Sequence, residues 1–335
     1  MTASRRKAFL SRAFFYSSPI LAGENEAGSL DKMESQMYER PIFSAVRRVP
    51  LAVITCLALQ FCTPVEHSES NVEFTTEFPT VLEESSALAF EDDLVWTLND
   101  SGNKAVLYAV SLQGQVVAEV PIRNARNIDW ESLAQDKSHF FVADTGNNLN
   151  SRDSFRIYRI PKPRLDSKDI TAELISIRYA GYESGNMASH NFDAEALAVR
   201  GAELWLFSKN RGNGNSDLYR LPKLPGNYLI ESTQSLPTQS LVTAADIHPE
   251  TSELVLVSSR REGSGFQSLI WFAPTTDEGV DWDRHQSAEI LPSDQWEAVV
   301  WLDETEVLLS HESNARGFAG LGRFKKRLAN QARTD

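Results

Sequence analysis

The sequence predicts an all-β fold, a five-bladed β-propeller, from three observations. A short motif recurs about every fifty residues, each copy is followed by short strand-like runs, and one more strand-like segment precedes the first copy. A period of about fifty residues exceeds that of helical solenoids and fits a blade of four strands. Six blades are the alternative if one repeat has diverged.

The motif is clearest in three copies, DWESLA at 129–134, DAEALA at 193–198 and QWEAVV at 295–300. Two weaker copies keep its apolar end, ESSALA at 84–89 and AADI at 244–247. The position two residues before the shared apolar residue is occupied in the five copies by Ser86, Glu131, Glu195, Ala245 and Glu297.

Each copy is followed by runs with the composition of β-strands, rich in branched and aromatic residues and too short for helices. Second strands are predicted at 94–98, 140–142, 204–207, 254–257 and 307–309. Third strands are predicted at 106–110, 155–160, 218–221, 269–272 and 321–324. Fourth strands are predicted at 115–122, 170–179 and 286–291, and the third repeat marks its fourth strand poorly.

The two ends of the repeat region are predicted to meet. The fifth repeat runs out of residues after its third strand, whereas 71–78 alternates apolar and polar residues ahead of the first repeat. An N-terminal strand that completes the last blade would explain both facts and leave no open ring. The propeller domain is therefore predicted to span 71–325, with a polar tail at 326–335.

The segment before the propeller reads as an export signal. Residues 37–66 carry arginines followed by a dozen mostly apolar residues, which is too short for a membrane span and typical of a signal peptide. Residues 1–36 lack periodicity and are predicted to be a non-native or disordered extension, with Met33 or Met37 as the natural start. We expect a periplasmic or extracellular protein.

Both cysteines of the chain, Cys56 and Cys62, lie in this leader. The propeller is thus predicted to contain no disulfide. Cys62 is a candidate for lipid attachment, and the alternative is simple cleavage between Thr63 and His67. The net charge of −13 argues against nucleic acid as a partner, because phosphate binding needs a cationic surface. We expect a monomer without a transmembrane span.

Equivalent residues of the five copies should converge on the axis, because the first strand of each blade lines the central channel. Carboxylates that share a small volume must hold protons or bind a cation. Oxygen ligands favour Ca²⁺, and no cluster of His or Cys has the spacing of a zinc site. The predicted calcium ligands are Ser86, Glu131, Glu195, Glu297 and Asp246. The alternative for each acid is a solvated rim position or an arginine partner.

A second set of polar residues follows the second strands, whose ends lie beside the starts of the first strands. It combines acids that could activate water with basic and amide groups that could hold an anionic substrate. The predicted catalytic residues are Asp100, Asp144 and Glu312. The predicted substrate-binding residues are Asn99, Lys209, Asn210, Arg211 and Arg260. The alternative is ordinary turn composition, in which Asn, Asp and Gly are common.

The order Ser, Glu, Glu, small residue, Glu, one per blade, resembles the axial calcium site of the calcium-activated nucleotidase (apyrase) family, whose fold is a five-bladed propeller. The resemblance implies calcium at the axis. This chain departs from the family in two places. Ala245 replaces a serine, and Ser101, Gly102 and Asn103 stand where the family has an arginine near the nucleotide phosphates. Nucleotide hydrolysis is therefore not expected from the resemblance.

The chain also resembles an uncharacterised group of exported bacterial β-propeller proteins. The matching segments are 84–89, Trp96 with 99–102, 129–131, 144–148 and 157–161. This resemblance spans most of the domain and implies no activity.

Three functions remain open from the sequence. The first is a Ca²⁺-dependent hydrolase of a small anionic ester, anhydride or lactone. The second is a non-catalytic propeller that binds a ligand or a cell-envelope component. The third is a scaffold whose metal only joins the blades.

Overall fold

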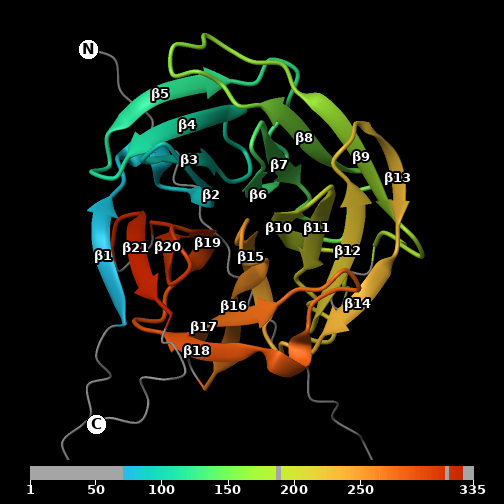
Figure 1. Cartoon of the computed structure of the whole chain (residues 1–335). Helices are drawn as coiled ribbons and strands as arrows, with labels where there is room; N and C mark the ends of the chain where they lie inside the picture. Colours follow the sequence, from blue (N-terminus) through green and yellow to red (C-terminus); the bar gives the residue numbers. More distant parts are fainter. Residues whose placement is uncertain (1–70, 186–189, 264, 314–316, 327–335) are drawn as a thin grey trace, which may run out of the picture. The chain divides into compact units, whose positions relative to one another are not determined.

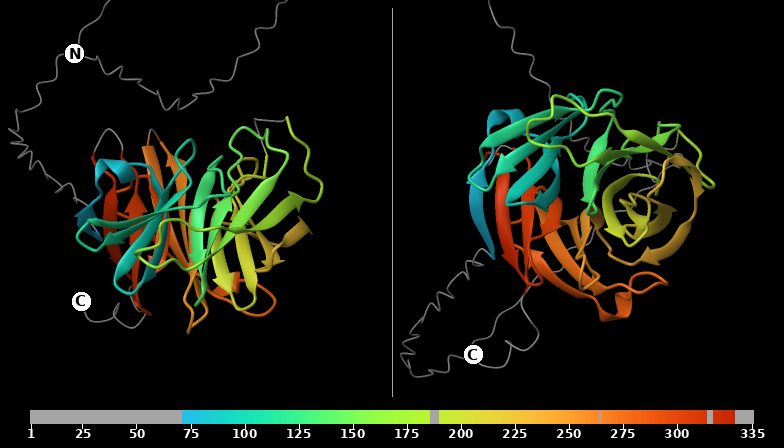
Figure 2. Two further views of the ribbon diagram at one scale, coloured as in Figure 1. Left: turned by 90° about the horizontal axis from the view of Figure 1, so that it is seen from above. Right: turned by 45° about the horizontal axis from the view of Figure 1, so that its top comes forward.

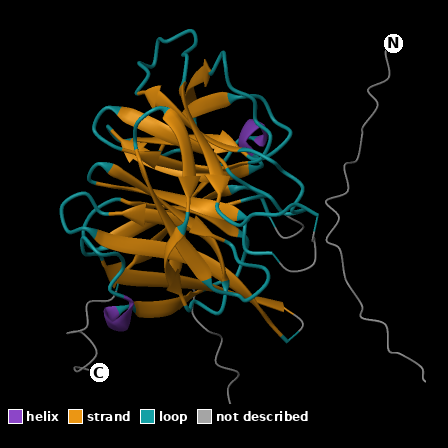
Figure 3. Cartoon of the chain, turned by 90° about the vertical axis from the view of Figure 1, so that its right-hand side faces the viewer, coloured by secondary structure: helices purple, strands orange, loops and turns teal. Residues whose placement is uncertain are grey.

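The repeats fold into β-sheets that surround one axis, as predicted. The structure is a computed structural model, and it describes residues 71–185, 190–263, 265–313 and 317–326. Among these residues the only helices are two single 3₁₀ turns, η1 (Thr80–Leu82) and η2 (Trp282–Arg284) (Figure 3). Within the described ranges no helix is long and apolar enough to cross a membrane.

The first two blades each begin with the strand nearest the axis (Figure 1). Blade 1 consists of β2 (Ser85–Glu91), β3 (Leu94–Asn99), β4 (Val106–Ser111) and β5 (Val116–Pro121). Blade 2 consists of β6 (Trp130–Gln135), β7 (His139–Asp144), β8 (Phe155–Pro161) and β9 (Glu173–Tyr179).

The remaining three blades follow the same plan, and their strands run along the axis in the side view of Figure 2. Blade 3 consists of β10 (Ala194–Arg200), β11 (Glu203–Ser208), β12 (Ser216–Pro222) and β14 (Ser232–Leu236). Blade 4 consists of β15 (Leu241–Ile247), β16 (Glu253–Glu262), β17 (Gly265–Pro274) and β18 (Gln286–Ile290). Blade 5 consists of β19 (Trp296–Trp301), β20 (Glu306–His311), β21 (Gly320–Lys325) and β1 (Val72–Glu77).

The predicted closure of the ring is confirmed. Strand β1 pairs antiparallel with β21, from Val72 opposite Phe324 to Glu77 opposite Gly320. The two strands approach each other so closely that a Cβ atom at Gly320 would overlap the carbonyl oxygen of Thr76. The N-terminal strand thus supplies the outer strand that the fifth repeat lacks, and the first strands of neighbouring blades contact one another around the ring.

The outer part of blade 3 departs from the prediction. Before its fourth strand the chain adds β13 (Gly226–Ile230), which pairs parallel with β9 of blade 2 and makes that sheet five-stranded. The fourth strand of blade 2 also starts later than the predicted 170–179, because Ile170 instead forms an isolated bridge with Ile122 of the preceding connection.

Large side chains fill the space between neighbouring blades. Trp96 of blade 1 packs against Phe140 of blade 2 with ring centroids 5.3 Å apart, and Trp130 and Tyr158, both of blade 2, lie 5.9 Å apart in the same core cluster. Each fully buried side chain of this size contributes about 1.5–3 kcal/mol to folding. The aromatic residues of four third strands occupy equivalent register positions: Tyr108, Tyr158, Tyr219 and Trp271.

Several predictions concern residues outside the described ranges. They include the extension at 1–36, the signal peptide at 37–66 and the cysteines Cys56 and Cys62. Of the tail at 326–335, only Lys326 is described, and its ammonium pairs with the Glu253 carboxylate at 2.6 Å.

Candidate metal centre

The first strand of every blade carries one extra residue near its start. The pairing with the second strand shifts there by one residue, which is a β-bulge, and a bulge turns its side chain out of the regular alternation. The residues skipped by the five register shifts are Ser86, Glu131, Glu195, Thr243 and Glu297.

The bulge corrects the alignment of the fourth repeat, where Thr243 takes the place predicted for Ala245. The hydrogen bonds support the new register. Ser86 Oγ donates to the carbonyl of Trp130 at 3.1 Å, and Thr243 Oγ1 donates to the carbonyl of Trp296 at 2.8 Å. In both cases the acceptor is the residue before the glutamate of the next blade, so the two hydroxyls are structural equivalents.

Asp246, predicted as a calcium ligand, lies away from the other predicted ligands. Its carboxylate accepts hydrogen bonds from the backbone N–H groups of Ile247 at 2.8 Å and Trp301 at 2.9 Å. Trp301 ends β19, whereas Glu297 lies near the start of that strand. Burial raises the pKa of Asp246 to about 7, and neighbouring carboxylates are not among the causes. The side chain therefore belongs to the opposite end of the axis.

The three predicted glutamates do come together. Burial and then the Glu195 carboxylate raise the pKa of Glu131 well above its ordinary value. Burial also raises the pKa of Glu195 to about 8, with Glu297 among the neighbours that contribute. The exposed fractions of Glu131 and Glu195 are only 9% and 3%. Residues far apart in the sequence thus form one group of acids, as the repeat register predicted.

The second strands add residues from one further equivalent position. It is the residue that follows the partner of the residue just before the bulge: Asp100, Thr145, Lys209, Ser259 and Glu312. Burial raises the pKa of Asp100 to about 6 and that of Glu312 to about 9, and Glu297 adds to both shifts. Two predicted catalytic acids therefore join the glutamates.

We call this group the axial acid cluster, and it also includes the acids two residues before the bulges. Its members are Glu84, Asp100, Asp129, Glu131, Asp193, Glu195, Glu297 and Glu312. Blade 4 contributes none of them, because Leu241 and Thr243 occupy the corresponding positions there.

The acids of blade 3 are paired with basic side chains of the same blade. The Lys209 ammonium contacts the Glu195 carboxylate, and Arg211 Nη2 lies 3.0 Å from Asp193 Oδ2. Burial would lower the pKa of Lys209, but Glu195 and Glu297 outweigh it and raise the pKa above its ordinary value. Lys209 and Arg211, predicted to bind substrate, therefore neutralise blade 3 in this structure.

The acids of blades 1 and 2 form the most compact part of the cluster. Asp100, Asp129 and Glu131 each place a carboxylate oxygen so that the three oxygens lie within 4.8 Å of one another. Among the described residues no lysine or arginine lies within ion-pair distance of these three carboxylates. Burial and then Asp100 raise the pKa of Asp129 to about 7.

Gly146 makes room for these oxygens. A Cβ atom at this position would overlap Glu131 Oε1 and Asp129 Oδ2 and would lie 2.6 Å from Asp129 Cγ. Two oxygens bound to one Ca²⁺ at 2.3–2.6 Å lie at most about 5 Å apart, so the spacing of the three carboxylates fits one calcium ion. The set contains only oxygen donors, which suits a hard cation rather than zinc.

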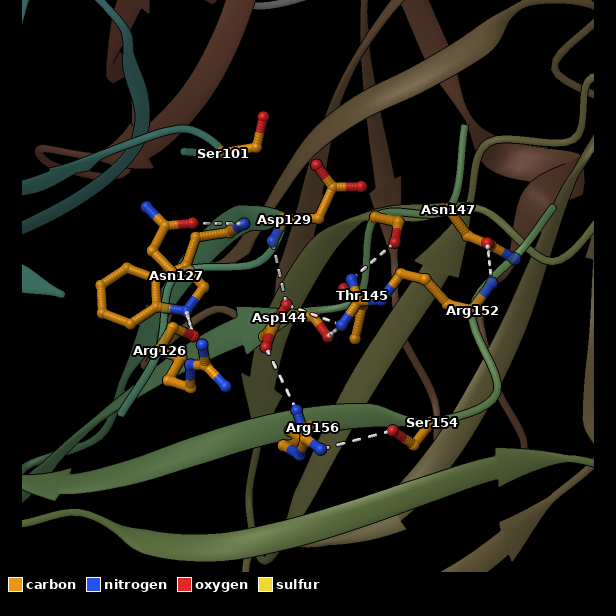
Figure 4. A network of polar contacts seen from close by, with 12 residues as sticks. Ser101, Arg126, Asn127, Asp129, Asp144, Thr145, Asn147, Arg152, Ser154 and Arg156 are labelled. Atoms are coloured by element: carbon orange, nitrogen blue, oxygen red, sulfur yellow. Dashed lines mark hydrogen bonds and ion pairs between the residues drawn. The ribbon is translucent and has the colours of Figure 1, made fainter. Parts of the chain in front are cut away.

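Asp144, predicted as catalytic, is held behind the cluster. Its side chain is fully buried, its Oδ1 lies 2.7 Å from Arg152 Nη2, and its Oδ2 lies 4.0 Å from Arg156 Nη1. Figure 4 shows that only the backbone N–H of Asp129 joins this network, at 3.1 Å, while the Asp129 carboxylate extends away from it. The geometry thus assigns Asp144 to the packing of blade 2.

Three predicted substrate-binding residues also have other roles in the structure. Asn99 donates to the carbonyl of Val81 at 2.7 Å, and Asn210 donates to Asp217 Oδ2 at 2.9 Å. Both asparagine side chains are buried. Arg260 is exposed on a hairpin extension of β16 and β17, where its Nε donates to Gln267 Oε1 at 2.7 Å.

Comparison with known proteins leaves the activity open. No family model and no curated protein matches the chain. The catalytic domain of the Coprinopsis cinerea GH62 α-L-arabinofuranosidase is similar over 76% of this chain and 96% of its own, with 10% identity and a TM-score of 0.44. A Bombyx mori GH32 β-fructofuranosidase is similar over 76% of this chain and 61% of its own, with 10% identity and a TM-score of 0.42. At these values the likeness supports no inference about substrate, and the resemblance to the nucleotidases stays a prediction.

Proposed function

We propose that the protein binds Ca²⁺ in the axial acid cluster, with Asp100, Asp129 and Glu131 as its ligands. The observation that carries the proposal is the 4.8 Å grouping of these three carboxylates without an ion-pair partner among the described residues. A divalent cation would replace the protons that the raised pKa values otherwise imply. Gly146 supports the proposal because it keeps the space beside two of the ligands free.

Two further predicted ligands lie at the same end of the axis as the proposed calcium site. Glu297 contributes to the raised pKa values of Asp100 and Glu312, so its carboxylate belongs to the same cluster but lies outside the compact group of three. Ser86 donates its hydroxyl proton to the Trp130 carbonyl, and its oxygen can still accept or ligate. Glu195 is assigned instead to Lys209, whose ammonium already contacts it.

We further propose hydrolysis of a small anionic ester, anhydride or lactone at this site. Bound calcium would supply a positive centre for the substrate anion. Asp100 is the proposed general base, because a carboxylate that ligates calcium through one oxygen can accept a proton from water through its other oxygen. Lys209 and Arg211 border the same cluster and offer a cationic side on which an anionic substrate group can be oriented.

A second candidate is a structural metal in a non-catalytic propeller that binds a ligand or an envelope component. It is favoured by one observation: the three proposed ligands come from two blades, with Asp100 following β3 and the other two at the start of β6. A metal here would join the first and second blades. Under either function we propose an exported protein, on the evidence of the leader at 37–66.

Metal analysis of the purified full-length protein, joined to thermal unfolding with and without a chelator, tests the proposal. We expect bound calcium and a lower unfolding temperature after chelation. Absence of metal together with an unchanged unfolding temperature in added Ca²⁺ would contradict it.

The two candidate functions are separated by Asp100→Asn in a hydrolysis screen of sugar phosphates, nucleotides and lactones. A catalytic Asp100 predicts lost turnover, and the variant's Ca²⁺ affinity, measured in parallel, reports its role as a ligand. A protein that binds calcium but turns over none of these substrates would favour the structural role.

A further inference from the structure

An asparagine in the connection between the first two blades contacts the backbone of both segments that carry the proposed calcium ligands. Asn127 lies between β5 and β6, and its side chain is half-buried. Its Nδ2 donates to the carbonyls of Asn99 and Asp100, at 2.8 Å each. Its Oδ1 accepts from the backbone N–H of Trp130 at 3.2 Å (Figure 4). One side chain therefore joins the end of β3 to the start of β6.

The residues that Asn127 contacts belong to the proposed metal site. Asp100 is one of the proposed ligands, and Trp130 stands between the other two, Asp129 and Glu131. The first ligand comes from blade 1 and the other two come from blade 2. The spacing of the three carboxylates therefore depends on how the two blades are held together at this end of the axis, and Asn127 contributes three hydrogen bonds to that link.

The blade 2 ligands are also held from behind by a buried ion pair. Asp144 Oδ1 accepts from the backbone N–H of Asp129 at 3.1 Å and from Arg152 Nη2 at 2.7 Å. Arg152 Nη1 donates to the carbonyl of Gly146 at 2.7 Å. The Asp144 side chain is fully buried and the Arg152 side chain is only 13% exposed. The backbone of Asp129 is thus fixed within blade 2, and Asn127 connects this fixed segment with Asp100.

We propose that Asn127 is a positioning residue that makes the site selective for Ca²⁺ over Mg²⁺. This inference rests on the proposed calcium site. Groups that hold metal ligands in place are typically worth about 10–100-fold in metal affinity. Mg²⁺ needs oxygens at about 2.0–2.1 Å in nearly ideal octahedral geometry, whereas Ca²⁺ accepts about 2.3–2.6 Å and irregular geometry. A bridge that fixes both ligand segments keeps them from closing around the smaller ion.

The same connection contains a matched residue for comparison. Asn124 Nδ2 donates to the carbonyl of Ala172 at 2.8 Å, and Asn124 Oδ1 accepts from the Ala172 N–H at 2.8 Å. Asn124 thus also ties the connection to another segment through backbone hydrogen bonds. Ala172 leads into β9, the fourth strand from the axis, and not into a segment that carries proposed ligands. If Asn127 only stabilised the connection, both asparagines would affect metal binding equally.

Calorimetric titration of the full-length wild type, Asn127→Ala and Asn124→Ala with Ca²⁺ and with Mg²⁺ tests the proposal. We expect Asn127→Ala to weaken Ca²⁺ binding about tenfold and Mg²⁺ binding less, so that the ratio of the Mg²⁺ Kd to the Ca²⁺ Kd falls at least about threefold. Asn124→Ala should leave both constants unchanged. Thermal unfolding in chelator should show similar small losses of stability in the two variants, because each loses hydrogen bonds to the backbone.

The outcomes separate this inference from the calcium proposal. A wild type that binds no Ca²⁺ would contradict the calcium site and the positioning role together. A wild type that binds Ca²⁺, with the same Ca²⁺ affinity in Asn127→Ala and Asn124→Ala, would overturn the role of Asn127 and leave the calcium site standing. An unchanged ratio of the two dissociation constants in Asn127→Ala would overturn its role in selectivity.

Discussion

The second and third blades present the same pair of acids to the axis but balance them differently. Blade 2 offers Asp129 and Glu131, and blade 3 offers Asp193 and Glu195 at the same register positions. In blade 3 a lysine and an arginine from the same blade pair with both acids. Blade 2 has no such pairs among the described residues. A buried charge needs a partner, so we expect a cation from solution to bind beside the acids of blade 2.

The largest expected effect is opposite stability changes in the metal-free protein. Glu195→Gln leaves the mostly buried Lys209 without its nearest carboxylate and should lower the free energy of unfolding by about 3 kcal/mol. Glu131→Gln removes a carboxyl group whose ionised form burial and its neighbours disfavour, so it should raise the free energy of unfolding at a pH high enough to ionise Glu131. Chemical denaturation in chelator measures both. Changes of the same sign would show that the two blades do not differ in this way.

The second effect is a dependence of stability on pH that calcium should suppress. Burial raises the pKa of Asp100 to about 6, of Asp129 to about 7 and of Glu312 to about 9. A carboxyl group with a raised pKa holds more protons in the folded than in the unfolded state, so its stabilising contribution is complete below about pH 4 and is lost as pH rises through its folded pKa.

We therefore expect the unfolding temperature of the metal-free protein to fall between about pH 5 and about pH 9. Calcium at one hundred times its Kd should add about 2.7 kcal/mol and flatten the fall. Differential scanning calorimetry in chelator and in Ca²⁺ makes the comparison. A metal-free protein that gains stability across this interval would contradict the raised pKa values.

A smaller effect is expected at Gly146, which limits the space on the blade 2 side only. Gly146→Ala should displace the ends of Glu131 and Asp129 and weaken Ca²⁺ binding about tenfold, with little change in the fold. Gly265→Ala is the control, because a Cβ there meets no atom closer than 3.9 Å. Equal calcium affinities for both variants would show that the space at Gly146 does not limit calcium binding.

The smallest effects concern the two hydroxyls at the bulges. Ser86→Ala and Thr243→Val each remove one hydrogen bond to the carbonyl before the next glutamate, and each should cost about 1 kcal/mol of stability. Thermal unfolding of both variants measures the cost. A loss in Ser86→Ala with none in Thr243→Val would argue against the equivalence of blades 1 and 4.

The gathering of Glu131, Glu195 and Glu297 could be predicted because the repeat preserved one register in three copies. The fourth copy misled the alignment, since Asp246 supplies an acid next to an apolar residue while the equivalent residue is Thr243. Hydropathy alone cannot separate these two alignments, because 241–247 is apolar or small at most positions. Only the bulge, a feature of strand pairing, decides between them.

The second strands show a similar limit. The sequence predicts the same role for Asp144 and Asp100, yet they lie one residue apart in register. A shift of one residue moves a side chain to the other face of a strand. The partners of Lys209 and the space at Gly146 depend on contacts between blades. Such contacts follow from the assembled ring and leave no local pattern in the sequence.

Calorimetric titration of Ca²⁺ into the wild type, Glu131→Gln and Glu195→Gln measures which of the two blades binds the metal. We expect Glu131→Gln to weaken binding by roughly a hundredfold or more, because even indirect contacts to a metal are worth 10–100-fold. Glu195→Gln should change it by less than about tenfold, because Lys209 already neutralises that carboxylate. Calcium binding that survives Glu131→Gln but is lost in Glu195→Gln would place the metal at blade 3 and not at blade 2.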